Sequence, residues 1–144
     1  MNNLEAFFNY SLMKLLLYSF LILYCFASGI QAQNDQEITS MDFVQVLHGN
    51  TEEAIYYYEN NWKQLRVKAL EKGYIKSYKL LQVTETNAEF QIVLQTTYAN
   101  KQQFEKREAH FQELIKAQGS LKLLNEKTPK DFRKTVFWSD TVGL

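Results

Sequence analysis

Residues 50–73 read NTEEAIYYYENNWKQLRVKALEKG, and this stretch predicts a long amphipathic helix. Asn50 and Glu53 have the spacing of a capping box at its start, and Gly73 can adopt the left-handed conformation that ends a helix. Apolar side chains recur every three or four residues, so they form one stripe that is expected to face the core: Ile55, Tyr58, Trp62, Leu65 and Ala69. We expect this helix to organise the fold.

Strand patterns lie on both sides of this helix, and a second helix follows them. Alternating apolar residues predict strands at residues 41–48, 74–84, 89–98 and 135–139, with a hairpin turn at 85–88. The second helix is expected at residues 100–119, capped by Asn100, and Thr128-Pro129 opens a further helical turn. The order predicts an α+β fold of the ferredoxin-like βαββαβ kind, an antiparallel sheet with helices on one face.

The N-terminal segment, residues 1–32, resembles an export signal. Lys14 precedes an apolar run at residues 15–26, and a small-residue stretch ends at Ala32. The run is shorter than the roughly 20 residues of a spanning helix, so we expect cleavage after Ala32 rather than a retained anchor, and no membrane span afterwards. Translation that starts at Met13 rather than at Met1 would give a more typical export signal. We therefore expect a secreted or periplasmic protein, checked by the mass of its exported form.

The mature chain is expected to start with a flexible leader at residues 33–40, followed by a single α+β domain at residues 41–144. The sequence has 16 basic and 16 acidic residues, which are interspersed and give a formal net charge of zero. Without a basic stripe, nucleic acid is not an expected partner. The one cysteine, Cys25, lies in the signal, so the core must stabilise the fold without disulfides. Two histidines and no metal-binding motif predict no metal and no cofactor.

The first two strands carry apolar residues on both faces, as in Phe43 beside Val44 and Leu80 beside Leu81. The helices cover one face only, and a solvated second face would be more polar. We therefore expect a homodimer in which two sheets pack face to face, a dimeric α/β barrel. The alternative cover is the chain's own C-terminal segment, residues 121–144.

Three stretches carry a resemblance to a known superfamily: HGNTEEAIYYYENNW, KGYIKSYKLL and FQIVLQTTYANKQQFEKREAHFQELI. Over residues 41–121 the chain resembles the dimeric α/β-barrel superfamily, and within it the antibiotic-biosynthesis-monooxygenase-like domains. The NIPSNAP-like and stress-responsive branches are similar almost as closely. The superfamily includes cofactor-free oxygenases, haem-degrading enzymes, isomerases and members without known activity, so the resemblance implies architecture more than chemistry. It implies a base or haem-ligand role for His110.

The candidate site residues are few. On a helical wheel His110 lies off the apolar stripe of its helix, which favours a surface position, whereas His48 ends the first strand, where it could overlook a cavity mouth. The better cavity wall is the outward face of the third strand, which mixes apolar and polar residues as small-molecule sites do: Gln91, Val93, Gln95 and Thr97.

Three functions are compatible with these patterns. We expect a non-enzymatic protein that binds a small apolar ligand in a sheet-lined cavity. The alternative is a monooxygenase-like or isomerase-like enzyme that acts on a small apolar substrate there, with His48 or His110 transferring protons. The third is an interaction domain whose cavity is filled by its own side chains.

Overall fold

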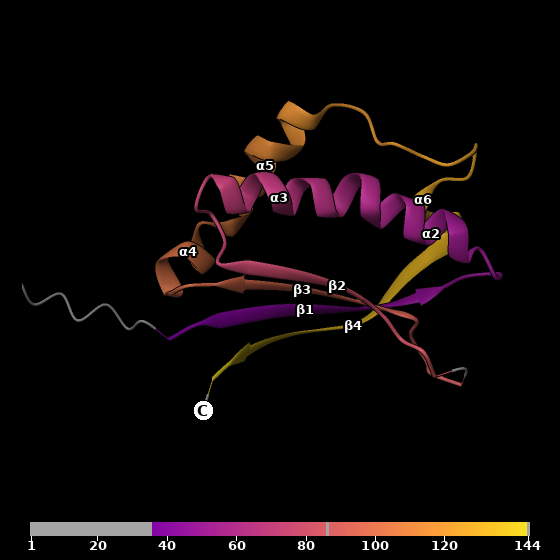
Figure 1. Cartoon of the computed structure of the whole chain (residues 1–144), viewed down its shortest axis with the longest axis horizontal. Coiled ribbons are helices and arrows are strands. Elements are labelled where there is room, and N and C mark those ends of the chain that lie inside the picture. Colours follow the sequence, from indigo (N-terminus) through magenta and orange to yellow (C-terminus); the bar gives the residue numbers. More distant parts are fainter. Residues whose placement is uncertain (1–35, 86, 144) are drawn as a thin grey trace, which may run out of the picture. The chain divides into compact units, whose positions relative to one another are not determined.

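Four strands form one antiparallel sheet in the order β2-β3-β1-β4 (Figure 1). The computed structural model describes residues 36–85 and 87–143. The strands are β1 (Ile38–Val46), β2 (Ser77–Gln82), β3 (Ile92–Tyr98) and β4 (Arg133–Val142). With the helices between them, this order is the ferredoxin-like βαββαβ topology that the sequence predicts.

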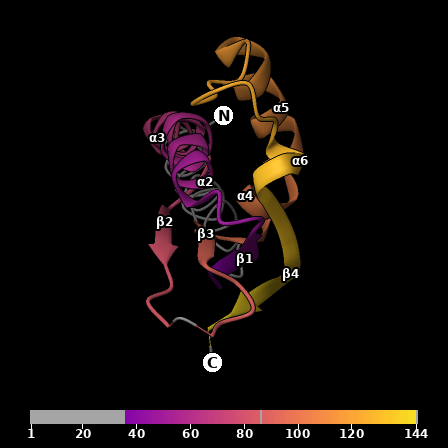
Figure 2. The ribbon, with the colours of Figure 1, turned by 90° about the vertical axis from the view of Figure 1, so that its right-hand side faces the viewer.

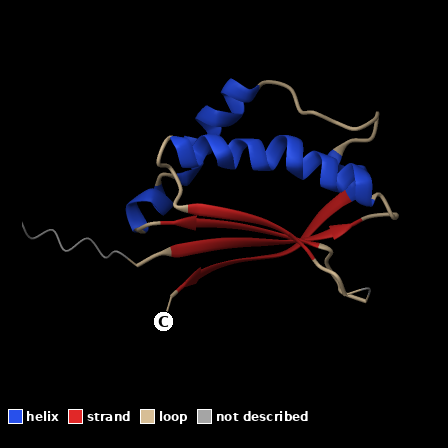
Figure 3. Ribbon diagram, in the orientation of Figure 1, coloured by secondary structure: helices blue, strands red, loops and turns tan. Residues whose placement is uncertain are grey.

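The helices lie on one face of the sheet, and the opposite face is bare in the described chain (Figures 2 and 3). Residues 51–71 form one helical rod in three parts: α2 (Thr51–Tyr57), the π-helical turn η1 (Tyr58–Trp62) and α3 (Lys63–Glu71). The second helical region divides at Lys106 into α4 (Lys101–Glu105) and α5 (Arg107–Gln118), and α6 (Pro129–Phe132) precedes β4. Proline at the first position of α6 confirms the expected helical turn.

The core lies between the sheet and this helical layer, in two clusters. The larger cluster packs sheet residues against α2, η1 and α6: Val44, Ile92 and Leu94 with Ala54, Tyr58, Trp62 and Phe132. The smaller cluster joins the ends of α3 and α5: Ala69, Ile75, Tyr98 and Leu114. Phe132 is only 1% exposed, so α6 anchors the start of β4 in the larger cluster.

Strand boundaries differ from the sequence expectation at both ends of the described chain. β1 begins at Ile38, so three residues expected in a flexible leader at 33–40 pair with β3 and β4 instead. β4 extends beyond residues 135–139 in both directions because β1 offers a partner along its whole length. The expected signal segment lies outside the described residues. Among the described residues, no helix has the length and hydropathy needed to cross a membrane.

The predicted capping box at Asn50 and Glu53 does not form. Both side chains instead contact α6 and the segment before it: Asn50 Nδ2 donates to the Asp131 carbonyl of α6 at 3.1 Å, and Lys127 Nζ lies 2.5 Å from Glu53 Oε1. A tertiary contact has therefore replaced a local one. The predicted ends at Gly73, with φ of 68°, and at Asn100, which accepts from the Gln103 amide, are confirmed.

The buried stripe of the first helical rod also differs from the expected one. Ile55 is 37% exposed, whereas Ala54 is fully buried and Asn61 is 2% exposed. The π-helical turn places an extra residue in one turn, which rotates the two halves of the rod relative to a regular 3.6-residue repeat. An asparagine thereby occupies a core position.

Candidate functional site

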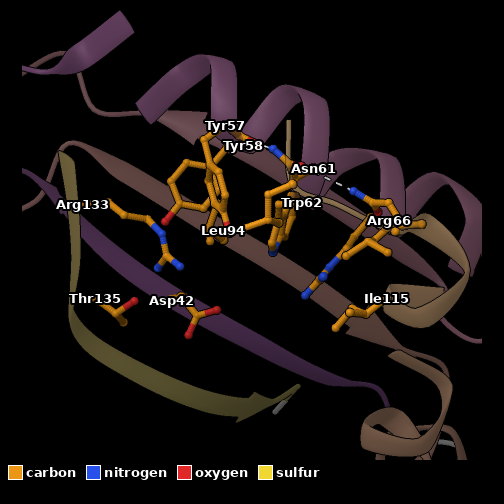
Figure 4. A pocket seen from close by; sticks show the side chains of 14 residues that line it. Asp42, Tyr57, Tyr58, Asn61, Trp62, Arg66, Leu94, Ile115, Arg133 and Thr135 are labelled. Carbon is orange, nitrogen blue, oxygen red and sulfur yellow. Dashed lines mark hydrogen bonds between the residues drawn. The ribbon is translucent and has the colours of Figure 1, made fainter. Parts of the chain in front are cut away.

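A cavity of about 290 Å³ lies between the helical rod, the end of α5 and strands β1 and β4 (Figure 4). We call it the helix-side cavity. Its wall combines aromatic and aliphatic side chains with a few polar ones: Asp42, Tyr57, Tyr58, Asn61, Trp62, Leu65, Arg66, Leu94, Ile115, Gln118, Gly119, Leu121, Arg133 and Thr135. An apolar wall with convergent polar groups is the usual composition of small-molecule sites.

The π-helical turn builds one side of this cavity. Asn61 Nδ2 donates to the Lys122 carbonyl at 2.8 Å, and the Lys122 amide donates back to Asn61 Oδ1 at 2.8 Å. The Asn61 amide also donates to the Tyr57 carbonyl one turn earlier, at 2.9 Å. The Asn61 side-chain amide thus bonds both the N–H and the C=O of one residue, as a neighbouring strand would, and it fixes the segment after α5 beside the cavity.

A β-bulge builds the opposite side. Phe43 pairs with Phe137, but the next residue, Val44, pairs with Thr135, so Val136 is the extra residue of β4. Because side chains alternate along a strand, the bulge reverses which face of the sheet each residue before it occupies. Thr135 and Arg133 therefore lie on the helix side and line the cavity, whereas Phe137 lies on the bare face.

Arg66 is held between two aromatic rings at one end of the cavity. Its guanidinium carbon lies 4.5 Å from the Trp62 ring centroid and 4.1 Å from that of Phe111, and Nε donates to Thr96 Oγ1 at 3.3 Å. Burial lowers the pKa of Arg66 to about 10, so the group stays charged at neutral pH. Stacking on both faces makes Arg66 a fixed positive charge.

Asp42 lies on β1 in the floor of the cavity, between the two arginines in the view of Figure 4. Burial raises the pKa of its carboxyl above the usual 3.8, and the nearby charges of Arg66 and Arg133 oppose this rise without cancelling it. No basic group in the described residues lies within 4.0 Å of this carboxyl. Asp42 is thus a poorly compensated acid in a cavity.

Unpaired polar atoms concentrate around the cavity. Within the described chain, four buried side-chain nitrogen or oxygen atoms have no hydrogen-bond partner, and three belong to cavity-lining residues: Tyr58 Oη, Gln118 Oε1 and Arg133 Nε. Burial raises the pKa of Tyr58 to about 12, so its hydroxyl keeps its proton. Arg133 lies over the ring of the neighbouring residue Tyr57, with its guanidinium carbon 5.1 Å from the ring centroid. Natural interiors rarely leave such groups unpaired.

The four residues expected as a cavity wall lie on the other side of the sheet. Two of the polar ones are already paired: Gln91 Oε1 accepts from the Val46 amide at 2.8 Å, and Thr97 Oγ1 lies 2.9 Å from Thr39 Oγ1. Val93 and Gln95 are half-buried on the bare face. None of the four lines the helix-side cavity.

Neither histidine lines this cavity. His48 is exposed in the turn between β1 and α2, where it and Gly49 have φ of 53° and 71° and the Asn50 amide bonds the Leu47 carbonyl at 3.0 Å. His110 is half-buried on α5, and its ring stacks on Tyr74 at 3.7 Å between centroids. No group of three His, Cys, Asp or Glu side chains comes together as a metal site among the residues described.

Several residues of the helix-side cavity have no individual signal in the sequence. Asp42 and Arg133 look like ordinary strand residues, since nothing local marks the bulge. The Asn60-Asn61 pair is the sequence feature that could have indicated this site, because two asparagines are unfavourable inside a long helix unless their amides have specific partners.

Comparison with known proteins adds no information on function. No family model matches the chain, and no curated protein matches it. Among solved structures, the crystal structure of HapK from Hahella chejuensis is similar at 12% identity and a TM-score of 0.47, over 74% of this chain and 92% of that one. Nothing about ligand or activity carries over at this level. Membership of the dimeric α/β-barrel superfamily stays a prediction.

Replacing Asn61 with alanine should loosen the wall of the cavity. We expect Asn61→Ala to lower the free energy of unfolding by about 1–3 kcal/mol, since it removes the hydrogen bonds of this buried side chain with the Tyr57 carbonyl and with the backbone of Lys122. Hydrogen exchange at the Lys122 amide should accelerate. Asn60→Ala is the matched control, because the Asn60 amide bonds the Tyr56 carbonyl within its own helix. Equal effects of the two variants would contradict the role given to Asn61.

The raised pKa of Asp42 predicts a pH-dependent stability. As pH rises, the unfolded chain loses this proton before the folded chain does, so the free energy of unfolding falls as pH passes through the folded pKa. Asp42→Asn removes this loss. In urea titrations the free energy of unfolding of Asp42→Asn, relative to that of the wild type, should therefore increase from pH 4 to pH 7. A variant that is less stable than the wild type at pH 7 but not at pH 4 would show that Asp42 is held by its arginine neighbours instead.

Proposed function

We propose that this protein binds a small organic molecule in the helix-side cavity and acts as a binding protein. The observation that carries the proposal is the gathering of three unpaired, buried polar atoms in residues lining one cavity. An unpaired buried polar atom costs free energy of about 1–3 kcal/mol. Each of these atoms has less than 1 Å² of accessible surface, so a ligand with matching groups recovers this cost when small side-chain rotations turn them towards it. The cavity volume, about 290 Å³, suits a molecule of amino-acid or aromatic-acid size.

The apolar part of the wall supports the same proposal. Trp62, Leu94 and Leu65 provide a rigid surface, and Trp62 and Leu94 are also members of the core. Their positions do not depend on the ligand, so the site is largely formed beforehand. A preformed site lowers the entropy cost of binding.

A second candidate is an enzyme, favoured by one observation. Asp42, whose pKa is raised by burial, shares the cavity with the Tyr58 hydroxyl, and a carboxyl group of shifted pKa in a cavity is a typical proton-transfer group. Isomerase-like or monooxygenase-like chemistry would then use Asp42 rather than either histidine. Product formation that Asp42→Asn abolishes would favour this candidate over simple binding.

We also propose a homodimer through the bare face of the sheet. Phe43 contacts both Phe90 and Phe137 there, with ring centroids at 4.8 and 5.5 Å, and Phe137 is 59% exposed. Among the described strand residues on this face, the charged ones are Lys79 and Lys134, both on edge strands. An uncharged aromatic centre suits contact with its own copy, since isologous contacts bring like residues together.

A fragment screen on the wild type and on a variant with a filled cavity tests the binding proposal. Small aromatic fragments should shift the NMR signals of Trp62 and Leu94, and Leu121→Trp should abolish these shifts by filling the cavity from its rim. Leu124→Trp is the control, since Leu121 and Leu124 are 52% and 46% exposed and only Leu121 lines the cavity. Shifts that persist in Leu121→Trp would place binding elsewhere and refute the proposal.

Light scattering coupled to size exclusion tests the dimer. The wild type should have twice the mass of one chain, and Val93→Glu should be monomeric or unfolded, because it buries an unpaired carboxylate at the centre of the contact. Val93→Thr, which keeps the shape without the charge, should remain largely dimeric. A folded wild-type monomer at high concentration would refute the dimer.

A further inference from the structure

The charge inside the helix-side cavity indicates which ligands it suits. Arg66 and Arg133 contribute two positive charges and Asp42 one negative charge, which leaves one positive charge in excess. In the described part of the chain, neither guanidinium has a carboxylate within 4.0 Å among the cavity residues. A single negative charge brought by a ligand would balance the site.

The two arginines differ in whether their Nε donors already have a partner within the protein. Arg66 is stacked between Trp62 and Phe111 and already donates from Nε to Thr96, so its position is fixed by the protein itself. Arg133 Nε is buried without an acceptor, and so is the hydroxyl of Tyr58, whose ring centroid lies 5.8 Å from the Arg133 guanidinium carbon. The Arg133 guanidinium lies close enough to the Tyr58 hydroxyl to lower its pKa, against the larger effect of burial. The hydroxyl proton and the Arg133 N–H groups can both still donate to one acceptor group.

We propose that the helix-side cavity selects a small monocarboxylate with an aromatic or alicyclic body, its carboxylate bound by Arg133 and Tyr58. Its body then lies along Trp62 and Leu94. Planar guanidinium groups bind carboxylates with two parallel hydrogen bonds, which favours an acid over a neutral carbonyl compound. Asp42 would repel a doubly charged group such as a phosphate monoester more strongly than a monoanion. This inference rests on the proposed function.

Three probes with the same body and different charge test the selection: 3-phenylpropanoate, 3-phenylpropanamide and 3-phenylpropylamine. Each is titrated into the full chain, and binding is followed by the NMR signals of Trp62 and Leu94. The acid should bind about tenfold or more tightly than the amide, as expected for a charge-assisted hydrogen bond, and the amine most weakly.

Two substitutions should move the affinity for the acid in opposite directions. Arg133→Gln should weaken it by about tenfold or more, and Asp42→Asn should strengthen it by roughly threefold to tenfold because a repelling charge is removed. Arg107→Gln is the matched control: Arg107 also stacks on an aromatic ring, Phe104 at 3.9 Å, but lies outside the cavity. It should leave the affinity unchanged.

Each outcome decides between the proposals. If the amide or the amine shifts the cavity signals and binds as tightly as the acid, the selection for a carboxylate is overturned while the cavity remains a binding site. If none of the three probes shifts Trp62 or Leu94 at millimolar concentration, this inference is overturned, whereas the wider proposal is judged by the fragment screen with Leu121→Trp. If Arg133→Gln does not fold, the ranking of the three probes on the wild type still decides.

Discussion

The helix side of this structure depends on the hydrogen bonds of the Asn61 side-chain amide with the backbone N–H and C=O of Lys122. After α5 the chain must cross the helical layer to place β4 beside β1, and it does so without regular secondary structure until α6. Two hydrogen bonds of 2.8 Å hold the start of that crossing. The burial of Phe132 holds its end. The space left between these two anchors is the helix-side cavity.

The cavity also depends on two irregularities that occur in otherwise regular elements. The π-helical turn brings Asn61 to the inner side of its helix, and the bulge at Val136 turns Arg133 and Thr135 towards the helices. Each irregularity gives up regular backbone pairing at one point, which weakens the element locally. Both lie beside the same cavity. Such irregularities are common next to functional sites, where they redirect a side chain that a regular element would place elsewhere.

The polar groups around the cavity are the observation that motivates the proposed binding role. A core polar group is normally satisfied, as Asn61 and Gln91 are, each with more than one hydrogen bond. Tyr58 Oη and Arg133 Nε have no hydrogen-bond partner, and the Asp42 carboxyl has no basic group within 4.0 Å in the described chain. Desolvation raises the pKa of Asp42, so its ionised carboxyl lowers the stability of the fold at neutral pH.

The sequence by itself determined the elements of this protein and their order. The apolar repeats of residues 50–73 and 89–98, the glycine at 73 and the cap at Asn100 are local signals, and local sterics and hydrogen bonding suffice to read them. They give the ferredoxin-like α+β fold. Tertiary structure decided where the cavity lies. Strand alternation predicted that Gln91, Val93, Gln95 and Thr97 share the face opposite the helices, and their role as a cavity wall stays a prediction. Alternation does not predict a cavity between the sheet and its helices. It also fails at a bulge, because one extra residue exchanges inward and outward positions, and only the pairing of β4 with β1 reveals that residue.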